Sequence, residues 1–288
     1  MTNRPMHPVS IIGLPGSGKT TFLAALWHLV RSGEVETRLG FGGLRFGNYQ
    51  HLNNIAARWR RALEQDRTQI AGMRTVTMDL TAADRAVRLT FPDVPGEDFQ
   101  RMWEDRKIEL ELAGTLSSGN VMLLINGNRI TAPNWVYDEA ELCRKLNIER
   151  TPGQPVPWHP GFAPDQVQLI ELLQCLRRPP LDCGPRRVAV MITVWDKAAG
   201  ERKAPAPFLA EKLSLLHQYL SGGRDGWTWR AYGVSAQGGE YDSSKEGAQP
   251  NAEAERLRDE DIPSHRIRLV NGDAESHDLT APLEWLMQ

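Results

Sequence analysis

The fold of this chain is decided by the stretch Gly13-Leu14-Pro15-Gly16-Ser17-Gly18-Lys19-Thr20. It matches the pattern G-x-x-x-x-G-K-[ST], and it lies between the apolar run 9–12 and an amphipathic segment that begins at Thr21. In that setting a strand leads into a glycine-rich turn, whose backbone N–H groups and following helix surround a phosphate chain. Lys19 is expected to contact the β and γ phosphates, and the Thr20 hydroxyl to bind Mg²⁺. The stretch therefore predicts a nucleotide-binding loop.

The composition of the 288 residues limits the class of protein. With 34 basic and 36 acidic side chains the net charge is −2, which gives no overall field for nucleic acid or an anionic membrane. Cys143, Cys175 and Cys183 are odd in number and lack C-x-x-C spacing, which favours free thiols in a reducing cytosol over disulfides or zinc. The start has no signal-peptide core, and the longest apolar run, 188–195, is too short to span a bilayer. We expect a cytoplasmic protein.

Apolar spacing predicts the secondary structure that follows the phosphate loop. Helical spacing covers 21–31, 49–65, 98–112, 165–177, 205–220 and 281–287. Strict alternation predicts strands at 76–80 and 87–91, joined by a turn that is short enough for an antiparallel hairpin. Further strands are predicted at 121–125, 187–194, 227–234 and 265–270. The glycine-rich residues 34–48 are predicted to form a tight, irregular connection.

Long stretches interrupt this pattern of strands and helices. We predict one domain over residues 1–288, with insertions at about 34–70, 127–186 and 239–263. The second insertion is rich in proline, and the third is polar and predicted to be mobile. The second insertion is either a docking surface for a protein partner or a simple cover for the core.

Polar residues follow several predicted strands at the edge of the sheet where the phosphate loop lies. Asp93 is placed for the magnesium side of a nucleotide site, and Gly96 can donate a backbone N–H to a γ phosphate. Asp196 can accept hydrogen bonds from the N1–H and 2-amino groups of guanine, and the turn Ser235-Ala236 can donate a backbone N–H to its O6. Adenine has no matching donor pair, so the predicted ligand is a guanine nucleotide.

The ordered set GLPGSGKT, DVPGE, TVWD and SAQ resembles the motif series of the translation-factor and Ras-like (TRAFAC) P-loop GTPases. The long insertions, the TVWD variant and the ending HDLTAPLEWL resemble the bacterial double-GTPase families that are associated with conflict and defence systems. The resemblance implies an α/β fold with a doubly wound, mainly parallel sheet of Ras-like order, one antiparallel strand from the hairpin, and nucleotide at the carboxyl edge. It also implies Mg²⁺ and GTP or GDP as ligands.

The resemblance assigns roles to individual residues. The implied nucleotide-binding positions are Gly13, Gly16, Ser17, Gly18, Lys19, Thr20, Thr21, Asp93, Gly96, Asp196, Lys197, Ser235 and Ala236. The implied catalytic residues are Lys19, Gly96 and Glu97. The implied magnesium ligands are Thr20, Asp93 and Thr68. Thr68 is preferred over Thr75 as the switch threonine because it lies in the predicted loop.

The chain also departs from the Ras-like pattern. Glu97 stands where Ras-like members carry a water-orienting glutamine, so slow intrinsic hydrolysis is expected. Thr193 and Val194 replace the usual asparagine and lysine of the base-reading motif. Packing against the base must then come from Trp195, Lys197 or an insertion.

Three functions remain open at the level of the sequence. The leading hypothesis is a Mg²⁺-dependent GTPase switch that is slow alone and regulated by a protein partner through the insertions. Glu97 motivates the alternative of a non-hydrolysing guanine-nucleotide scaffold, and Val194 leaves open an ATPase that shares only the phosphate machinery. No nucleic-acid partner and no membrane partner are expected. The pathway and the oligomeric state are not specified.

Overall fold

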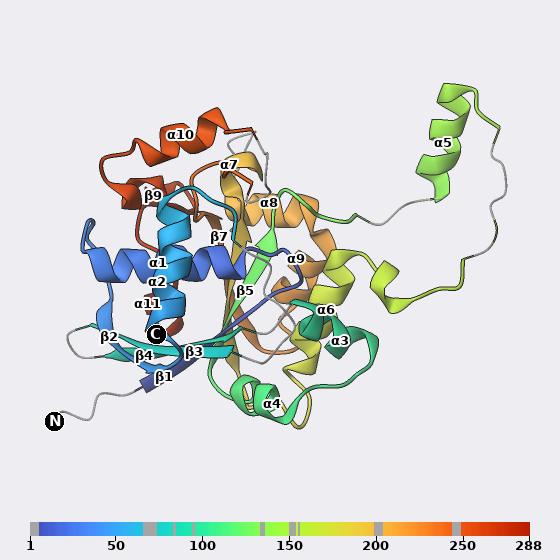
Figure 1. Ribbon diagram of the computed structural model, residues 1–288. Helices are drawn as coiled ribbons and strands as arrows, with labels where there is room; N and C mark the ends of the chain where they lie inside the picture. Colours follow the sequence, from blue (N-terminus) through green and yellow to red (C-terminus); the bar gives the residue numbers. More distant parts are fainter. Residues whose placement is uncertain are drawn as a thin grey trace.

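The computed structural model describes residues 6–65, 74–82, 85–93, 96–132, 136–149, 154, 156–198, 204–243 and 249–288. Figure 1 shows helices on both sides of a twisted central sheet, with helix α5 (Val136–Leu146) carried away from the rest. Among the described helices, none combines the length and the apolar character that a membrane crossing requires.

In the described residues a single nine-stranded sheet has the order β2-β3-β4-β1-β5-β6-β7-β8-β9. The strands are β1 (Met6–Ile12), β2 (Gly40–Phe46), β3 (Arg74–Thr81), β4 (Ala86–Asp93), β5 (Asn120–Asn126), β6 (Arg186–Thr193), β7 (Trp227–Ser235), β8 (Arg268–Asn271) and β9 (Ala274–Ser276). Strands β4, β1, β5, β6 and β7 run parallel, whereas β2, β3, β8 and β9 pair antiparallel toward the two edges. The predicted mainly parallel sheet and its antiparallel hairpin are therefore confirmed. Both β3 and β8 run against the parallel strands, so the expectation of one antiparallel strand is wrong.

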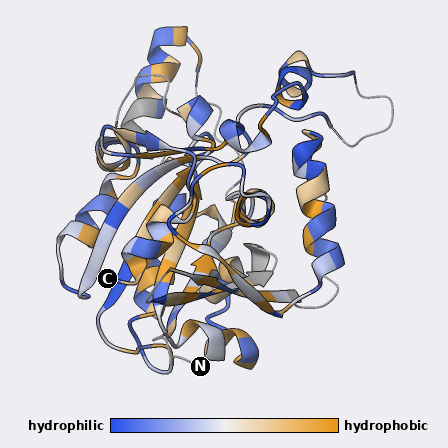
Figure 2. Ribbon diagram, turned by 90° about the vertical axis from the view of Figure 1, so that its left-hand side faces the viewer, coloured by the Kyte–Doolittle hydropathy of each residue, from blue (hydrophilic) through white to orange (hydrophobic). Residues whose placement is uncertain are grey.

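The helices fall into two layers that follow from the alternation of strand side chains. The α-helices besides α5 are α1 (Lys19–Ser32), α2 (Tyr49–Arg60), α3 (Gly96–Glu104), α4 (Leu110–Leu116), α6 (Asp165–Cys175), α7 (Trp195–Ala198), α8 (Pro205–Lys212), α9 (Ser214–Ser221), α10 (Ala252–Arg258) and α11 (Ala281–Leu286). On β5, Met122 and Leu124 pack in the cluster that contains α1, α2, α10 and α11. Leu123 and Ile125 pack in the cluster that contains α3, α4, α6, α8 and α9. Figure 2 shows hydrophobic residues concentrated along the strands between these layers.

Several predicted elements differ from the structure. Residues 40–46 form the edge strand β2 rather than an irregular connection, and the predicted helix 98–112 is two helices, α3 and α4. The predicted helix 205–220 breaks at Leu213, whose backbone has φ −131° and ψ 51°. In the third insertion, α10 is a packed helix that buries Ala254 and Leu257, so the prediction of a wholly mobile segment is wrong for residues 252–258.

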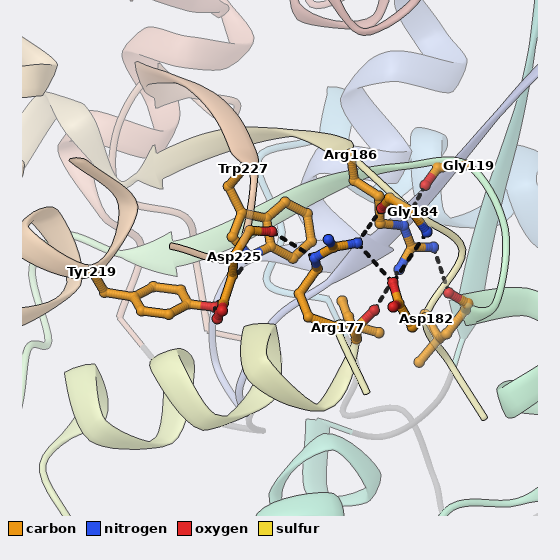
Figure 3. Close-up of polar contacts among 10 residues, drawn as sticks. Gly119, Arg177, Asp182, Gly184, Arg186, Tyr219, Asp225 and Trp227 are labelled. Carbon is orange, nitrogen blue, oxygen red and sulfur yellow. Dashed lines mark hydrogen bonds and ion pairs between the residues drawn. The ribbon is translucent and has the colours of Figure 1, made fainter. Parts of the chain in front are cut away.

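Two arginines stabilise the amino edge of β6 and β7 (Figure 3). This edge is opposite the one that carries the phosphate loop, which follows the carboxyl end of the parallel strand β1. Arg177 donates to the Asp225 carbonyl at 2.6 Å and to the Asp182 carboxylate at 2.8 Å. The buried Arg186 donates to the carbonyls of Gly119 at 2.7 Å and of Leu116, the last residue of α4, at 2.5 Å. Burial lowers the pKa of Arg186, and the negative end of the α4 dipole favours its charge. These contacts hold the strand ends that face away from the predicted site.

A second polar group at this edge involves Tyr219 (Figure 3). The Tyr219 hydroxyl donates to an Asp225 carboxylate oxygen at 2.5 Å and lies 3.1 Å from the indole nitrogen of Trp227. Burial and the hydrogen bond to Asp225 both raise the pKa of Tyr219. Tyr219 therefore stays neutral at physiological pH and connects α9 to the start of β7.

Candidate functional site

The phosphate loop joins β1 to α1, and glycine is required at several of its positions. Gly16 and Gly18 have φ of +71° and +85°, which residues with a Cβ rarely adopt. At Gly13 a Cβ would lie 2.5 Å from the carbonyl oxygen of Leu124 on β5. The loop is thus closely packed on the neighbouring strand, and its backbone leads directly into the N-terminus of α1.

Lys19, the first residue of α1, folds back over this loop. Its Nζ donates to the carbonyls of Gly13 at 2.8 Å and Leu14 at 3.2 Å, and it lies 3.5 Å from the Ser17 hydroxyl. The ammonium group is also 5.6 Å from the centroid of the Phe99 ring. A positive charge and the positive end of α1 therefore meet at one loop, which is the arrangement that a phosphate chain needs.

Two residues connect the loop to the ends of β5 and β6. Sequence reasoning does not single out Asn126, and it names Thr193 without predicting a contact with the loop. Asn126 donates from its side-chain amide to the Gly16 carbonyl at 2.9 Å. The Thr193 hydroxyl lies 3.0 Å from the Ser17 carbonyl and 3.2 Å from the Ile125 carbonyl, and its single proton can serve one of them at a time. The sequence carries a signal for both, since each is a polar residue that directly follows an apolar run, 121–125 or 188–192.

The predicted base-reading residues are brought together at the same edge of the sheet. The parallel register of β6 and β7 pairs Thr193 with Val234, so the residues that follow each strand lie at the same level. The Ser235 hydroxyl donates to Oδ1 of Asp196 at 2.6 Å and accepts from the Gly238 backbone N–H at 3.2 Å. These bonds orient the Asp196 carboxylate with respect to the turn that contains Ala236.

Trp195, one of the residues expected to pack against the base, lies in the core instead. Trp195 is 2% exposed and packs on Phe208 with ring centroids 5.2 Å apart. A Cβ at Gly233 would lie 2.4 Å from the Trp195 ring, so the indole fills the core beneath β7. The expectation that Trp195 packs against a base is therefore wrong. Lys197 forms an ion pair with Glu240, which joins α7 to the third insertion.

Val194 occupies an unusual backbone conformation at the start of this turn. Its φ is +56°, in the left-handed region that β-branched residues avoid. Such a conformation costs about 1–3 kcal/mol and persists only where the surroundings impose it. The Val194 carbonyl accepts from the backbone N–H groups of Lys197 at 3.1 Å and Ala198 at 3.0 Å. The first turn of α7 thus starts directly after β6 and places Asp196 at the edge of the sheet.

The magnesium side of the predicted site is described only by its backbone. The parallel register pairs Ser10 of β1 with Thr90 of β4, so Asp93 lies level with Gly13 of the phosphate loop. Gly96 and Glu97 begin α3. The side chains of Asp93 and Glu97 lie outside the described part of the chain, as does Thr68 entirely.

A buried histidine on α1 makes the stability of this region depend on pH. His28 Nε2 lies 3.2 Å from Glu34 Oε2, which also accepts from the Ser264 backbone N–H at 3.0 Å. Burial is the main cause that lowers the pKa of His28, and the charges of Arg60 and Arg266 add to it. Burial raises the pKa of Glu34, but hydrogen bonds from Ser264 and His28 outweigh this and lower it overall.

We expect the thermal midpoint of the protein to fall as the pH is lowered from 7.5 to 5. Near the ordinary histidine pKa of 6.5 the unfolded chain takes up a proton that folded His28 does not, so acid favours unfolding. The variant His28→Gln cannot titrate, and its midpoint should fall less over the same range. Calorimetry of both proteins checks this, and identical pH profiles would contradict it.

A family model described as Double-GTPase 1 matches residues 10–286 of the chain. Among solved structures, a GTP-binding protein from Sulfolobus solfataricus in complex with GDP is 12% identical, with 80% of this chain and 47% of that chain covered and a TM-score of 0.36. Sup35 complexed with GDP is 14% identical, with 90% and 46% covered and a TM-score of 0.36. Nucleolar GTP-binding protein 1 from Plasmodium falciparum is 10% identical, with 81% and 79% covered and a TM-score of 0.38.

The chain spans about half the length of the first two of these structures. A search of curated protein sequences finds no match.

Proposed function

This chain belongs to the Double-GTPase 1 family, and from that premise we propose that it binds a guanine nucleotide across the carboxyl edge of its sheet and hydrolyses GTP. The observation that carries the proposal is the placement of two separate sites on that edge. Lys19 and the phosphate loop follow β1, while the hydrogen-bonded pair Asp196 and Ser235 follows β6 and β7. One ligand with phosphates at one end and a purine at the other fits both.

Guanine is the purine that this pair favours. The Asp196 carboxylate, oriented by the Ser235 hydroxyl, would accept from the N1–H and 2-amino groups of guanine. The backbone N–H of Ala236 would donate to O6. Adenine has no donor at its N1 and an amino group in place of O6, so it would leave the carboxylate unpaired.

We propose Mg²⁺ as the metal that accompanies the nucleotide. Thr20 in the first turn of α1 and Asp93 at the end of β4 supply hydroxyl and carboxylate oxygens, which is the ligand chemistry that Mg²⁺ prefers. Thr68 is proposed as a further ligand. When bound, the cation would neutralise charge on the β and γ phosphates.

Hydrolysis would rest on positioning and electrostatic stabilisation by the protein. Lys19 and the backbone N–H groups of the loop would hold the phosphates, with Gly96 proposed as a further donor to the γ phosphate. Glu97 would orient the attacking water less well than an amide, because it adds negative charge near the phosphates. Slow turnover that a partner accelerates is the proposed consequence. The exposed Leu142, Leu146 and Trp158 of the second insertion support its use by a protein partner.

We expect GDP and GTP, each with Mg²⁺, to raise the thermal midpoint of the nucleotide-stripped protein by several degrees. A ligand at about a hundred times its dissociation constant adds about 2.7 kcal/mol of stability, and shifts of this size are easily resolved for a chain of this length. ADP and ATP at the same concentration should produce a smaller shift. Equal shifts with adenine nucleotides would favour an ATPase instead, and no shift with any of the four would contradict nucleotide binding.

A further inference from the structure

A buried hydrogen bond links α2 to the turn that would read the base. Trp59, in the last turn of α2, is fully buried, and its indole Nε1–H donates to the carbonyl oxygen of Ala236 at 2.7 Å. The two residues are 177 positions apart in the chain. We propose that Trp59 is a positioning residue which fixes the Ser235-Ala236 turn and thereby sets selectivity for the O6 atom of guanine. This inference rests on the proposed function.

The indole itself is held from several directions. The ring of His28 on α1 lies 4.9 Å from it, and the guanidinium carbon of Arg266 lies 5.1 Å from its ring. Arg266 also donates to the carbonyls of Trp59 at 3.2 Å and Arg60 at 2.9 Å, where α2 ends. A tryptophan so enclosed has no freedom to follow a moving loop. It therefore imposes its own position on Ala236.

Backbone hydrogen bonds also join the residues after α2 to the segment that follows the turn. After α2, the Ala62 carbonyl accepts from the Asp242 N–H at 2.9 Å, and the Glu64 N–H donates to the Asp242 carbonyl at 3.0 Å. The turn at 235–239 is thus bounded by β7 on one side and by this pairing on the other. The Ala236 carbonyl lies between them, and Trp59 supplies its donor.

The position of this carbonyl decides where the neighbouring N–H groups point. The Ala236 carbonyl lies in one planar peptide unit with the Gln237 N–H, and the φ and ψ rotations of Ala236 separate it from the Ala236 N–H. Fixing the carbonyl at one end of a turn whose other end continues β7 restricts both rotations, and with them the direction of the Ala236 N–H. Without the indole donor, a buried carbonyl would lose its partner, and the turn would favour conformations in which that oxygen reaches another donor. The fraction of molecules competent to bind O6 would then fall, and the apparent affinity with it.

The proposal separates two parts of guanine recognition. Asp196, oriented by the Ser235 hydroxyl, would read the N1–H and 2-amino groups. In the described residues no hydrogen bond joins Trp59 to either of these side chains. The O6 contact depends on Ala236 alone. A change at Trp59 should therefore alter selectivity at O6 and leave selectivity at the 2-amino group unchanged.

The test compares Trp59→Phe with wild-type protein by calorimetric titration of GDP, 6-thio-GDP and IDP. The first analogue replaces O6 by sulfur, a weaker acceptor, and the second lacks the 2-amino group. In wild type we expect GDP to bind about tenfold more tightly than 6-thio-GDP, the effect of roughly one hydrogen bond. In W59F this ratio should fall to about two or less, while the ratio of GDP to IDP stays within about twofold of wild type.

Trp27→Phe is the matched control. Trp27 is also buried, and its indole N–H donates to the Asn53 side chain at 2.9 Å, between α1 and α2. The substitution removes an indole donor in the same way, but in the described residues no hydrogen bond joins Trp27 to the turn. Both nucleotide ratios should remain those of wild type in W27F.

The outcomes separate this inference from the proposed function. Wild-type protein that does not prefer GDP over ADP contradicts the proposed function itself. Wild-type preference with an unchanged 6-thio-GDP ratio in W59F, or an equal loss for all three nucleotides, overturns the role of Trp59. If W59F does not fold, exchange of the Trp59 indole N–H in wild type decides the question. It should be at least about tenfold slower with GDP bound, since GDP fixes the turn, and equal rates would overturn the proposal.

Discussion

Lys19→Ala is expected to abolish multiple-turnover phosphate release and to weaken binding of GDP and GTP by about 100-fold. The ammonium group lies on the phosphate loop, where it donates to two of its carbonyls, and hydrogen bonds to charged groups contribute about 1.5–3 kcal/mol. Its loss also removes a donor from the carbonyls of Gly13 and Leu14, of which Leu14 keeps the Ser17 backbone N–H at 3.2 Å. Both the ligand and the shape of the loop are therefore affected.

The measurement is phosphate release under multiple turnover, together with nucleotide affinity by titration. Lys212→Ala is a suitable control, because it removes a lysine from the exposed surface of α8. Wild-type turnover in the Lys19 variant would contradict the proposed hydrolysis. Absent turnover in wild type as well, with intact GDP binding, would favour the non-hydrolysing scaffold.

Asp196→Asn is expected to change the preferred base from guanine to xanthine. The carboxamide can still accept from N1–H, but its NH₂ group faces the 2-amino group of guanine with no acceptor between them. Xanthine carries an oxygen at that position and accepts from the new donor. In the wild-type structure the Ser235 hydroxyl donates to Oδ1 of Asp196 at 2.6 Å. It can donate to the asparagine oxygen of the variant in the same way, so the turn keeps its orientation.

We expect affinity for GDP to fall by roughly 100-fold or more in D196N, with a comparable gain for XDP. Titration of both nucleotides into wild type, D196N and the surface control Glu211→Gln measures the exchange of preference. Equal losses for GDP and XDP would show that Asp196 supports the turn rather than reads the base.

The central part of the fold could be predicted because its signals are local. A glycine-rich stretch between an apolar strand and an amphipathic helix specifies one geometry, and unbroken apolar runs such as 121–125 specify buried parallel strands. Strand β2 could not be predicted in this way, since glycine weakens strand formation. At Gly42 a Cβ would lie 2.8 Å from Thr81 and 2.9 Å from the Asp79 carbonyl. Glycine is needed there for close contact with β3, which only the folded sheet reveals.

The sequence predicts those site residues that lie at or directly after the end of a strand. It does not predict those whose role depends on contacts with residues far away in the chain. Asp196 and Ser235 were predicted as one group, and the structure places them in a hydrogen bond. Asn126, Thr193 and Trp59 act through bonds to residues far away in the chain, which no local pattern encodes. Of the three alternatives for packing against the base, only Trp195 is excluded. A tryptophan beside Asp196 suits both a base and a core, and only the space at Gly233 decides between them.

The strand order also sets the length of the ligand that the proposed site would accept. From β1 to β7 the sheet takes three steps, through β5 and β6, and neighbouring strands lie about 4.8 Å apart, so the two ends of the site are separated by roughly 14 Å. Guanosine alone would reach only the far end, and inorganic triphosphate only the near one. Because joining two weakly bound fragments raises their effective concentration, an intact nucleotide should bind far more tightly than both fragments added together. On the proposed binding mode, the sheet would select a ligand by its length as well as by its chemistry.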